Sequence, residues 1–195
     1  MKNIVFDLGG VLFARDKSKC TPELLEFFSF LRAPRMPLFW EEYDRGTSTL
    51  EEVTATISGM TGRPVETCAA VLRRAVDLQE PVKPTERLVG DLKAAGYRLY
   101  VLSNMSREFI AFLRRFPVYR LFDGEVVSCE EGTVKPEPRI YEILLERYGL
   151  DPAETLFIDD RAANIAAAEG LGIAGYLFDH RNPAAACDEL RRRLL

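Results

Sequence analysis

Four groups of polar residues lie at predicted strand ends or in loops: Asp7, Ser103-Asn104, Lys135 and Asp159-Asp160. A carboxylate can attack phosphorus and form an acyl phosphate, which divides one difficult displacement into two steps. Hydroxyl, amide and ammonium donors can hold the phosphate oxygens. Paired carboxylates favour Mg²⁺, which prefers hard oxygen ligands. Together the four groups indicate phosphoryl chemistry assisted by a metal ion.

Asp7 stands where a buried strand would end. The apolar run that starts at Asn3 is short, and Gly9 and Gly10 close it with a tight loop. Runs of this kind are typical of parallel strands covered on both faces. Ligands of open α/β sheets bind outside the carboxyl ends of the strands, so Asp7 is predicted to face a ligand.

The rest of the chain supplies elements that would bring the other three groups to the same edge. Beyond residue 84, segments with helical spacing alternate with short apolar segments. The predicted strands cover 98–103, 125–128, 155–159 and 174–178, and the predicted helices cover 85–95, 107–115, 138–148, a segment ending near 171 and the C-terminus. This alternation predicts an α/β fold with a doubly wound parallel sheet and right-handed crossovers.

Only helical signals appear from about Thr21 to Asp77. Thr21 with Pro22 predicts a helix start, and Ser48 with Glu51 predicts a capping box. Three or four short helices fit in this stretch. We therefore predict two domains: residues 1–16 and 81–195 form the α/β core, and residues 17–80 form a small helical insertion.

The composition excludes several classes of function. The chain has 195 residues, 47% of them hydrophobic, and a net charge of −4, which gives no electrostatic attraction to nucleic acid. No apolar run approaches the ~20 residues of a membrane span, and the N-terminal run is too short for a signal peptide. Four dispersed cysteines fit reduced thiols. We predict a cytoplasmic protein that binds neither nucleic acid nor membrane; its oligomeric state is not predicted.

The four polar groups, in this order, resemble the motifs of the haloacid dehalogenase-like hydrolase superfamily. "VFDLGGVLF" is similar to its first motif, "YVLSN" to the second, "VKPEPRIYEILL" to the third and "LFIDDRAANIAAAEGLG" to the fourth. The resemblance implies a Rossmann-like core, and it makes the helical insertion a type 1 cap. Within the superfamily, Asp-Leu-Gly at the first motif and the pair Arg45-Gly46 are most similar to α-D-glucose-1-phosphate phosphatases.

The resemblance implies a role for each matching residue. Asp7 would be the nucleophile, and Lys135 would neutralise charge beside it. Ser103 and Asn104 would bind phosphate, and Arg45 would contact the substrate from the cap. The implied activity is a Mg²⁺-dependent phosphatase that acts on a small phosphorylated metabolite through an aspartyl-phosphate.

The resemblance also implies a Mg²⁺ site, with one departure from the family pattern. Asp7 and Asp160 would bind the ion directly, Asp159 directly or through water, and Gly9 through its backbone carbonyl. Many relatives carry a second Asp where this chain has Gly9. That residue normally acts as general acid and base, which is typically worth ~10²–10⁴-fold in rate. Its absence predicts an acidic leaving group, as in sugar-1-phosphates, acyl phosphates or aryl phosphates.

Two other functions remain open. A metal-independent 2-haloacid dehalogenase would use the same aspartate on carbon, although paired aspartates without a cation would repel a carboxylate substrate. A catalytically weak module that binds a phosphorylated ligand or a protein would explain the missing acid. Asp16 is a weaker candidate for a replacement acid, Asn164 for support of the aspartate loop, and His180 is assigned to a turn.

Overall fold

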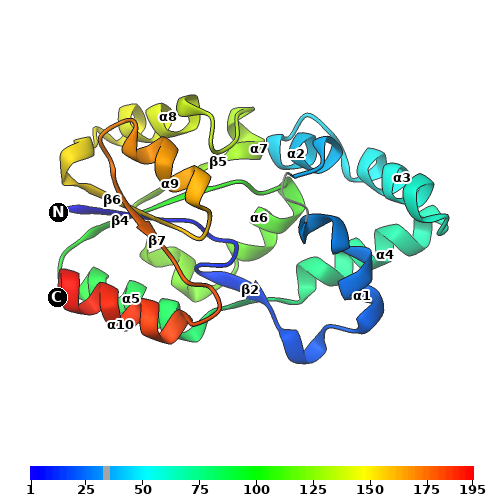
Figure 1. Cartoon of the computed structure of the whole chain (residues 1–195), viewed down its shortest axis with the longest axis horizontal. Coiled ribbons are helices and arrows are strands. Elements are labelled where there is room, and N and C mark those ends of the chain that lie inside the picture. Colours follow the sequence, from blue (N-terminus) through cyan, green and yellow to red (C-terminus); the bar gives the residue numbers. More distant parts are fainter. Residues whose placement is uncertain (33–35) are drawn as a thin grey trace.

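The computed structural model describes residues 1–32 and 36–195, and its centre is a five-stranded parallel sheet (Figure 1). The strand order is β5-β4-β1-β6-β7. The strands are β1 (Asn3–Phe6), β4 (Arg98–Ser103), β5 (Gly124–Val127), β6 (Thr155–Asp159) and β7 (Ala174–Leu177). Because β1 lies in the middle and the chain winds outward from it in both directions, the predicted doubly wound α/β fold is confirmed.

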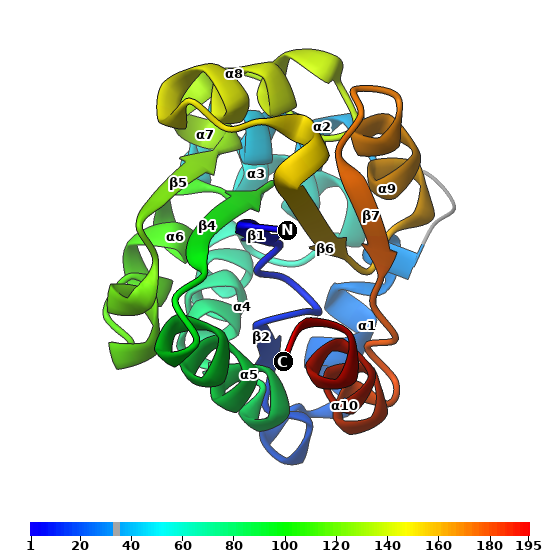
Figure 2. The same cartoon turned by 90° about the vertical axis from the view of Figure 1, so that its left-hand side faces the viewer.

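Helices cover both faces of this sheet (Figures 1 and 2). On one face pack α5 (Lys83–Ala94), α6 (Arg107–Leu113) and α10 (Pro183–Leu194), and on the other α8 (Pro138–Tyr148) and α9 (Ala162–Glu169). β1 serves both cores, since Ile4 and Phe6 point to the first face and Val5 to the second. Within residues 1–32 and 36–195, no helix combines the length and apolarity needed to cross a membrane.

A separate group of helices lies at the carboxyl ends of the strands, opposite both chain termini (Figure 1). The group consists of α1 (Pro22–Phe27), α2 (Leu38–Arg45), α3 (Leu50–Thr61) and α4 (Val65–Asp77). These helices bury a hydrophobic cluster around Trp40, Ile57 and Leu72, to which α6 contributes Phe109. We call α1–α4 the helical layer. The domain boundaries at residues 16/17 and 80/81 stay a prediction.

Two short strands join the helical layer to the sheet. β2 (Phe13–Arg15) and β3 (Gln79–Pro81) pair antiparallel. This ribbon was not predicted from the sequence, because strands of three residues are too short to show alternation. The remaining short helices are η1 (Lys17–Lys19), η2 (Ser29–Arg32), η3 (Pro117–Leu121), α7 (Ser128–Glu131) and η4 (Pro152–Glu154).

The predicted capping box of α3 was wrong by one residue. Thr49, not Ser48, accepts the backbone hydrogen bond from Glu52, and the Glu52 carboxylate accepts one from the Thr49 backbone. Both residue pairs have the spacing of a capping box, so the sequence pattern alone does not distinguish them.

Candidate active site

Asp7 lies one residue beyond β1, and its backbone N–H still donates to Ile158 of β6 at 2.9 Å. Its carboxylate is anchored through one oxygen. Oδ1 accepts hydrogen bonds from the Leu8 backbone at 2.7 Å and from the Ser103 hydroxyl at 2.9 Å. Among the described residues, no hydrogen bond reaches Oδ2, and Asp7 lines a cavity. One carboxylate oxygen is thus oriented by the protein while the other is left for a ligand.

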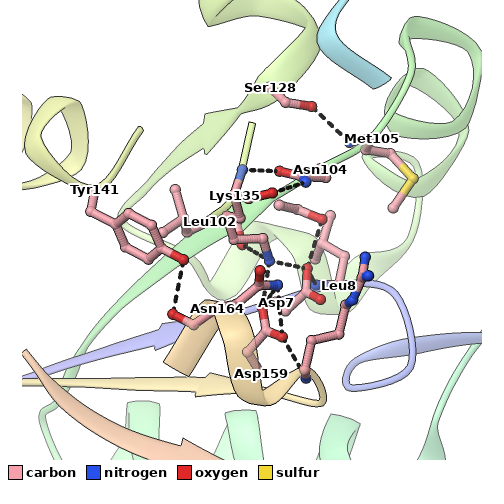
Figure 3. Close-up of polar contacts among 12 residues, drawn as sticks. Asp7, Leu8, Leu102, Asn104, Met105, Ser128, Lys135, Tyr141, Asp159 and Asn164 are labelled. Carbon is pink, nitrogen blue, oxygen red and sulfur yellow. Dashed lines mark hydrogen bonds and ion pairs between the residues drawn. The ribbon is translucent and has the colours of Figure 1, made fainter. Parts of the chain in front are cut away.

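Lys135 is held in place by three acceptors that match its three N–H bonds. Its Nζ lies 2.9 Å from Asp7 Oδ1, 2.6 Å from Asp159 Oδ2 and 3.0 Å from the carbonyl oxygen of Leu102 (Figure 3). Asn104 fixes the backbone of the same lysine, because its side-chain amide donates to Lys135 O at 2.9 Å and accepts from Lys135 N at 2.7 Å. Asn104 therefore also positions Lys135.

Asp159 is fully buried and uses its carboxylate to hold the site together. It accepts from Lys135 at 2.6 Å, from the Arg161 backbone at 2.8 Å and from the Asn164 amide at 3.0 Å to each oxygen. These four contacts match the roughly four lone-pair positions of a carboxylate. In turn, the Tyr141 hydroxyl donates to the Asn164 carbonyl at 2.9 Å (Figure 3). Asn164 thus supports Asp159 from behind.

Asp160 is more open than its neighbour and faces the loop after β1. Its Oδ2 lies 3.2 Å from Nδ1 of His180, a contact that the sequence analysis did not predict. Gly10 has φ of +77°, and a Cβ added there would lie 2.4 Å from Asp160 Oδ2. Only glycine lets the loop approach this carboxylate so closely.

The donor set fits a hard divalent cation. Asp7, Asp159 and Asp160 each offer a carboxylate oxygen, and these oxygens lie within 4.8 Å of one another. Burial raises the pKa of Asp7 to about 7, against the opposing charge of Lys135. Burial also raises the pKa of Asp160 to about 6, with the negative charge of Asp159 acting in the same direction. The site therefore holds more carboxylates than one buried ammonium balances, as expected where a cation binds.

A cavity of about 560 Å³ lies between these residues and the helical layer. From the sheet side it is lined by Asp7, Gly9, Asn104, Lys135, Pro136, Asp160, Arg161, Ala163 and Asn164, and from the other side by Met36, Glu41 and Asp44. No sequence pattern predicted Glu41, Asp44 and Arg161 as site residues. Asp44 directly precedes the Arg45-Gly46 pair that the sequence analysis singled out, but no spacing rule says which side chain of a helix end faces a cavity.

Two predicted phosphate or substrate ligands lie elsewhere. Ser103 is fully buried and donates to Asp7, so in this structure it contacts the carboxylate that the resemblance makes the nucleophile. The Arg45 guanidinium pairs with Glu137 at 2.6 Å and with Glu41 at 2.9 Å, and Arg45 does not line the cavity. Direct substrate binding by Arg45 stays a prediction that none of these contacts supports.

Comparison with known proteins gives matches over nearly the whole chain. A family model described as a haloacid dehalogenase-like hydrolase matches residues 1–172. The sesquiterpene phosphatase astK of Aspergillus oryzae is 30% identical over 98% of this chain and 95% of its own length. The D-ribitol-5-phosphate phosphatase of Bacteroides thetaiotaomicron is 28% identical, over 88% of this chain and 89% of its own length. The likeness to α-D-glucose-1-phosphate phosphatases stays a prediction.

The fold also matches solved structures. A HAD family enzyme from Bacteroides thetaiotaomicron, crystallised with magnesium and inorganic phosphate, superimposes with a TM-score of 0.72. It is 28% identical, and the match covers 92% of this chain and 95% of that one.

Proposed function

This chain belongs to the haloacid dehalogenase-like hydrolase family, and from that premise we propose that it is a Mg²⁺-dependent phosphatase acting on a small phosphorylated metabolite, with Asp7 as nucleophile. One observation carries the proposal. Asp7 lines a cavity, and its Oδ2 accepts no hydrogen bond from any described residue, while Oδ1 is held by Ser103 and Lys135. A nucleophile that is oriented through one oxygen and open at the other is ready for attack.

The residues support a two-step reaction. Asp7 Oδ2 attacks phosphorus, the bond from phosphorus to the ester oxygen breaks, and an acyl phosphate forms on Asp7. Water then cleaves the acyl phosphate and releases inorganic phosphate. Lys135 contacts Asp7 directly, so its positive charge offsets the negative charge that phosphate brings to this carboxylate.

Asp7, Asp160 and the Gly9 carbonyl are the groups that would hold Mg²⁺ directly. Asp159 would act through water, since hydrogen bonds from the protein already occupy both of its oxygens. When bound, the ion supplies positive charge for the phosphate oxygens. The related Bacteroides enzyme that was crystallised with magnesium and inorganic phosphate supports this assignment.

The substrate is a small phosphate ester. A cavity of about 560 Å³ is within the range that takes metabolites. Arg161 lines it, and its guanidinium forms no ion pair with any described residue, so it is available to polar groups of the substrate. With no acid at Gly9, a sugar phosphate with an acidic leaving group is the substrate class that the sequence predicts. The printed name of one relative, however, specifies D-ribitol 5-phosphate, an ester of an ordinary alcohol.

The deciding experiment is a panel of phosphate esters with Mg²⁺, assayed with the wild type, Asp7→Asn and a control, Asp16→Asn. The Asp16 carboxylate binds Ser18 and Lys19 and does not line the cavity, so this control should retain activity. Phosphate release that disappears only in Asp7→Asn supports the proposal. Chloride release from a 2-haloacid without Mg²⁺ would show a dehalogenase instead. If no ester of the panel releases phosphate, the result would favour a module that binds a phosphorylated ligand or a protein.

A further inference from the structure

The loop after β1 has no acidic or basic side chain at position 9 that could transfer the protons of the proposed reaction. Gly9 has no side chain, and a Cβ added to it would meet no atom within 4 Å. The space beside Asp7 where relatives place an acid is therefore open to the cavity. Any replacement has to reach the same cavity from another element.

Most acidic and basic groups near the cavity already have partners. Asp159 is saturated by four hydrogen-bond contacts, and Glu41 pairs with Arg45 at 2.9 Å. His180 is about half exposed, pairs with Asp160 and does not line the cavity. Asp160 itself is proposed as a metal ligand. Asp44 remains, and its carboxylate forms no hydrogen bond or ion pair within the described part of the chain.

We propose that Asp44, on α2 of the helical layer, takes over the role of the missing acid and base, giving a proton to the leaving oxygen and later accepting one from the attacking water. This inference rests on the proposed phosphatase function and adds a catalytic residue to it. Its basis is that Asp44 lines the cavity together with Asp7 and that its carboxylate pairs with none of the residues that the structure describes.

The backbone at Asp44 is fastened to the sheet side of the site. The hydroxyl of Ser128, the first residue of α7, donates to the Asp44 carbonyl and accepts from the backbone of Met105 at 2.9 Å. Met105 directly follows Asn104, which fixes Lys135 (Figure 3). The position of Asp44 is thus linked by two hydrogen bonds to the loop that positions Lys135.

The end of α2 is also closely packed against the sheet side of the site. Gly46 ends α2 with φ of +79°, and a Cβ there would lie 2.4 Å from the carbonyl oxygen of Cys129. Arg45 is paired with Glu137 at 2.6 Å on the same side. Proton transfer occurs over hydrogen-bond distance, so a group that transfers a proton has to be held in place. The contacts on both sides of Asp44 hold its backbone in this way.

The electrostatic environment of Asp44 suits this role. Burial, together with the nearby negative charge of Asp7, raises the pKa of Asp44 to about 7, and the positive charge of Arg161 opposes this rise. Glu41 and Lys135 are the other charged groups that act on it. A group that exchanges its proton near neutral pH can serve as acid in one step and as base in the next.

The proton balance closes over the two steps. As Asp7 attacks and the ester bond breaks, the Asp44 carboxyl group gives its proton to the leaving oxygen, and an alcohol departs. The Asp44 carboxylate then takes a proton from water while the water oxygen attacks the phosphorus of the acyl phosphate. Inorganic phosphate leaves, and both Asp7 and Asp44 return to their starting states. With this donor, the leaving group need not be acidic.

The test compares the wild type with Asp44→Asn and Asp44→Ser on three esters of rising leaving-group pKa: 4-nitrophenyl, phenyl and ethyl phosphate. The loss of kcat/KM in the variants should grow along this series, reaching ~10²–10⁴-fold for ethyl phosphate. With 4-nitrophenyl phosphate, one equivalent of nitrophenolate should appear in a burst, because loss of the base slows cleavage of the acyl phosphate. Glu42→Gln, an exposed carboxylate on the same helix, is the matched control and should behave as wild type.

The outcomes separate this inference from the proposed function. An equal loss on all three esters, or no loss in either folded variant, overturns the role of Asp44. With either of these outcomes, the proposed phosphatase function still stands if Asp7→Asn is inactive in the same assays. If the wild type itself hydrolyses none of the esters, both proposals are overturned.

Discussion

Replacing Lys135 with Met should destabilise the protein and the site together. The side chain is 1% exposed, and it binds Asp159, which is 0% exposed, and Asp7, which is 10% exposed. Removing one partner of a buried ion pair costs ~3–5 kcal/mol because the remaining charge is left without compensation. Here Asp159 keeps its bonds from Asn164 and Arg161, and Asp7 can take up a proton. We therefore expect a loss at the lower end of this range, about 3 kcal/mol in the free energy of unfolding.

The expected change in melting temperature follows from the size of the chain. For a protein of this length, 1 kcal/mol corresponds to ~2–4 °C, so Lys135→Met should melt about 6–12 °C below the wild type in EDTA. The matched control is Lys93→Met. Lys93 pairs with Asp123 at the surface, where such a pair contributes about 0–1 kcal/mol.

The pH dependence of this loss tests its cause. Lys135 lowers the pKa of Asp7, so without the lysine the pKa of Asp7 rises beyond about 7. A carboxyl group with a raised pKa in the folded state binds its proton more tightly there, which favours the folded protein as the pH falls. The deficit in Tm should therefore shrink from about pH 9 to about pH 6. A deficit no larger than that of Lys93→Met, or one that grows on acidification, would refute the reasoning.

Three further predictions concern the metal, the helical layer and position 9. Mg²⁺ at 100 times its Kd should stabilise the wild type by about 2.7 kcal/mol, and Asp160→Asn should lose most of the corresponding rise in Tm. Arg45 holds the pKa of Glu137 at about 2, well below its ordinary value. The ion pair therefore stabilises the folded protein fully at a pH above that ordinary value, and this stabilisation is lost as the pH falls toward 2. Glu137→Gln should lower Tm at neutral pH by up to about 3 °C, and by less near pH 3. Gly9→Asp should fold normally, because the added Cβ meets no atom, and should restore part of the ethyl phosphate hydrolysis lost in Asp44→Asn.

The sheet and its helices could be predicted because their patterns are long and local. β4, α8 and β6 have the predicted bounds, since each is a continuous apolar or helically spaced run between clear breaks. The β2–β3 ribbon could not be predicted, because its pairing joins residues more than sixty positions apart and each strand has three residues. Local pattern specifies the core, while long-range pairing specifies how the helical layer attaches to it.

The site, too, has a part that local sequence pattern predicts and a part that depends on long-range contacts. Asp7, Lys135, Asp159 and Asp160 could be predicted to meet, because the ends of parallel strands share one edge of the sheet. Arg45 and Asp44 could not be told apart in this way. Neighbours on a helix point in different directions, and which one faces the cavity depends on how α2 docks against Ser128 and Glu137.

An acid on α2 also changes what the helical layer does in the reaction. An acid at position 9 would move with the nucleophile, whereas Asp44 reaches the cavity only while α2 is docked against α7. The contacts that hold it there are the Ser128 hydroxyl on the Asp44 carbonyl, the close approach of Gly46 to Cys129 and the ion pair of Arg45 with Glu137. Docking of α2 would then complete the catalytic machinery as well as close off the cavity from water, so proton transfer would be available only in the closed site.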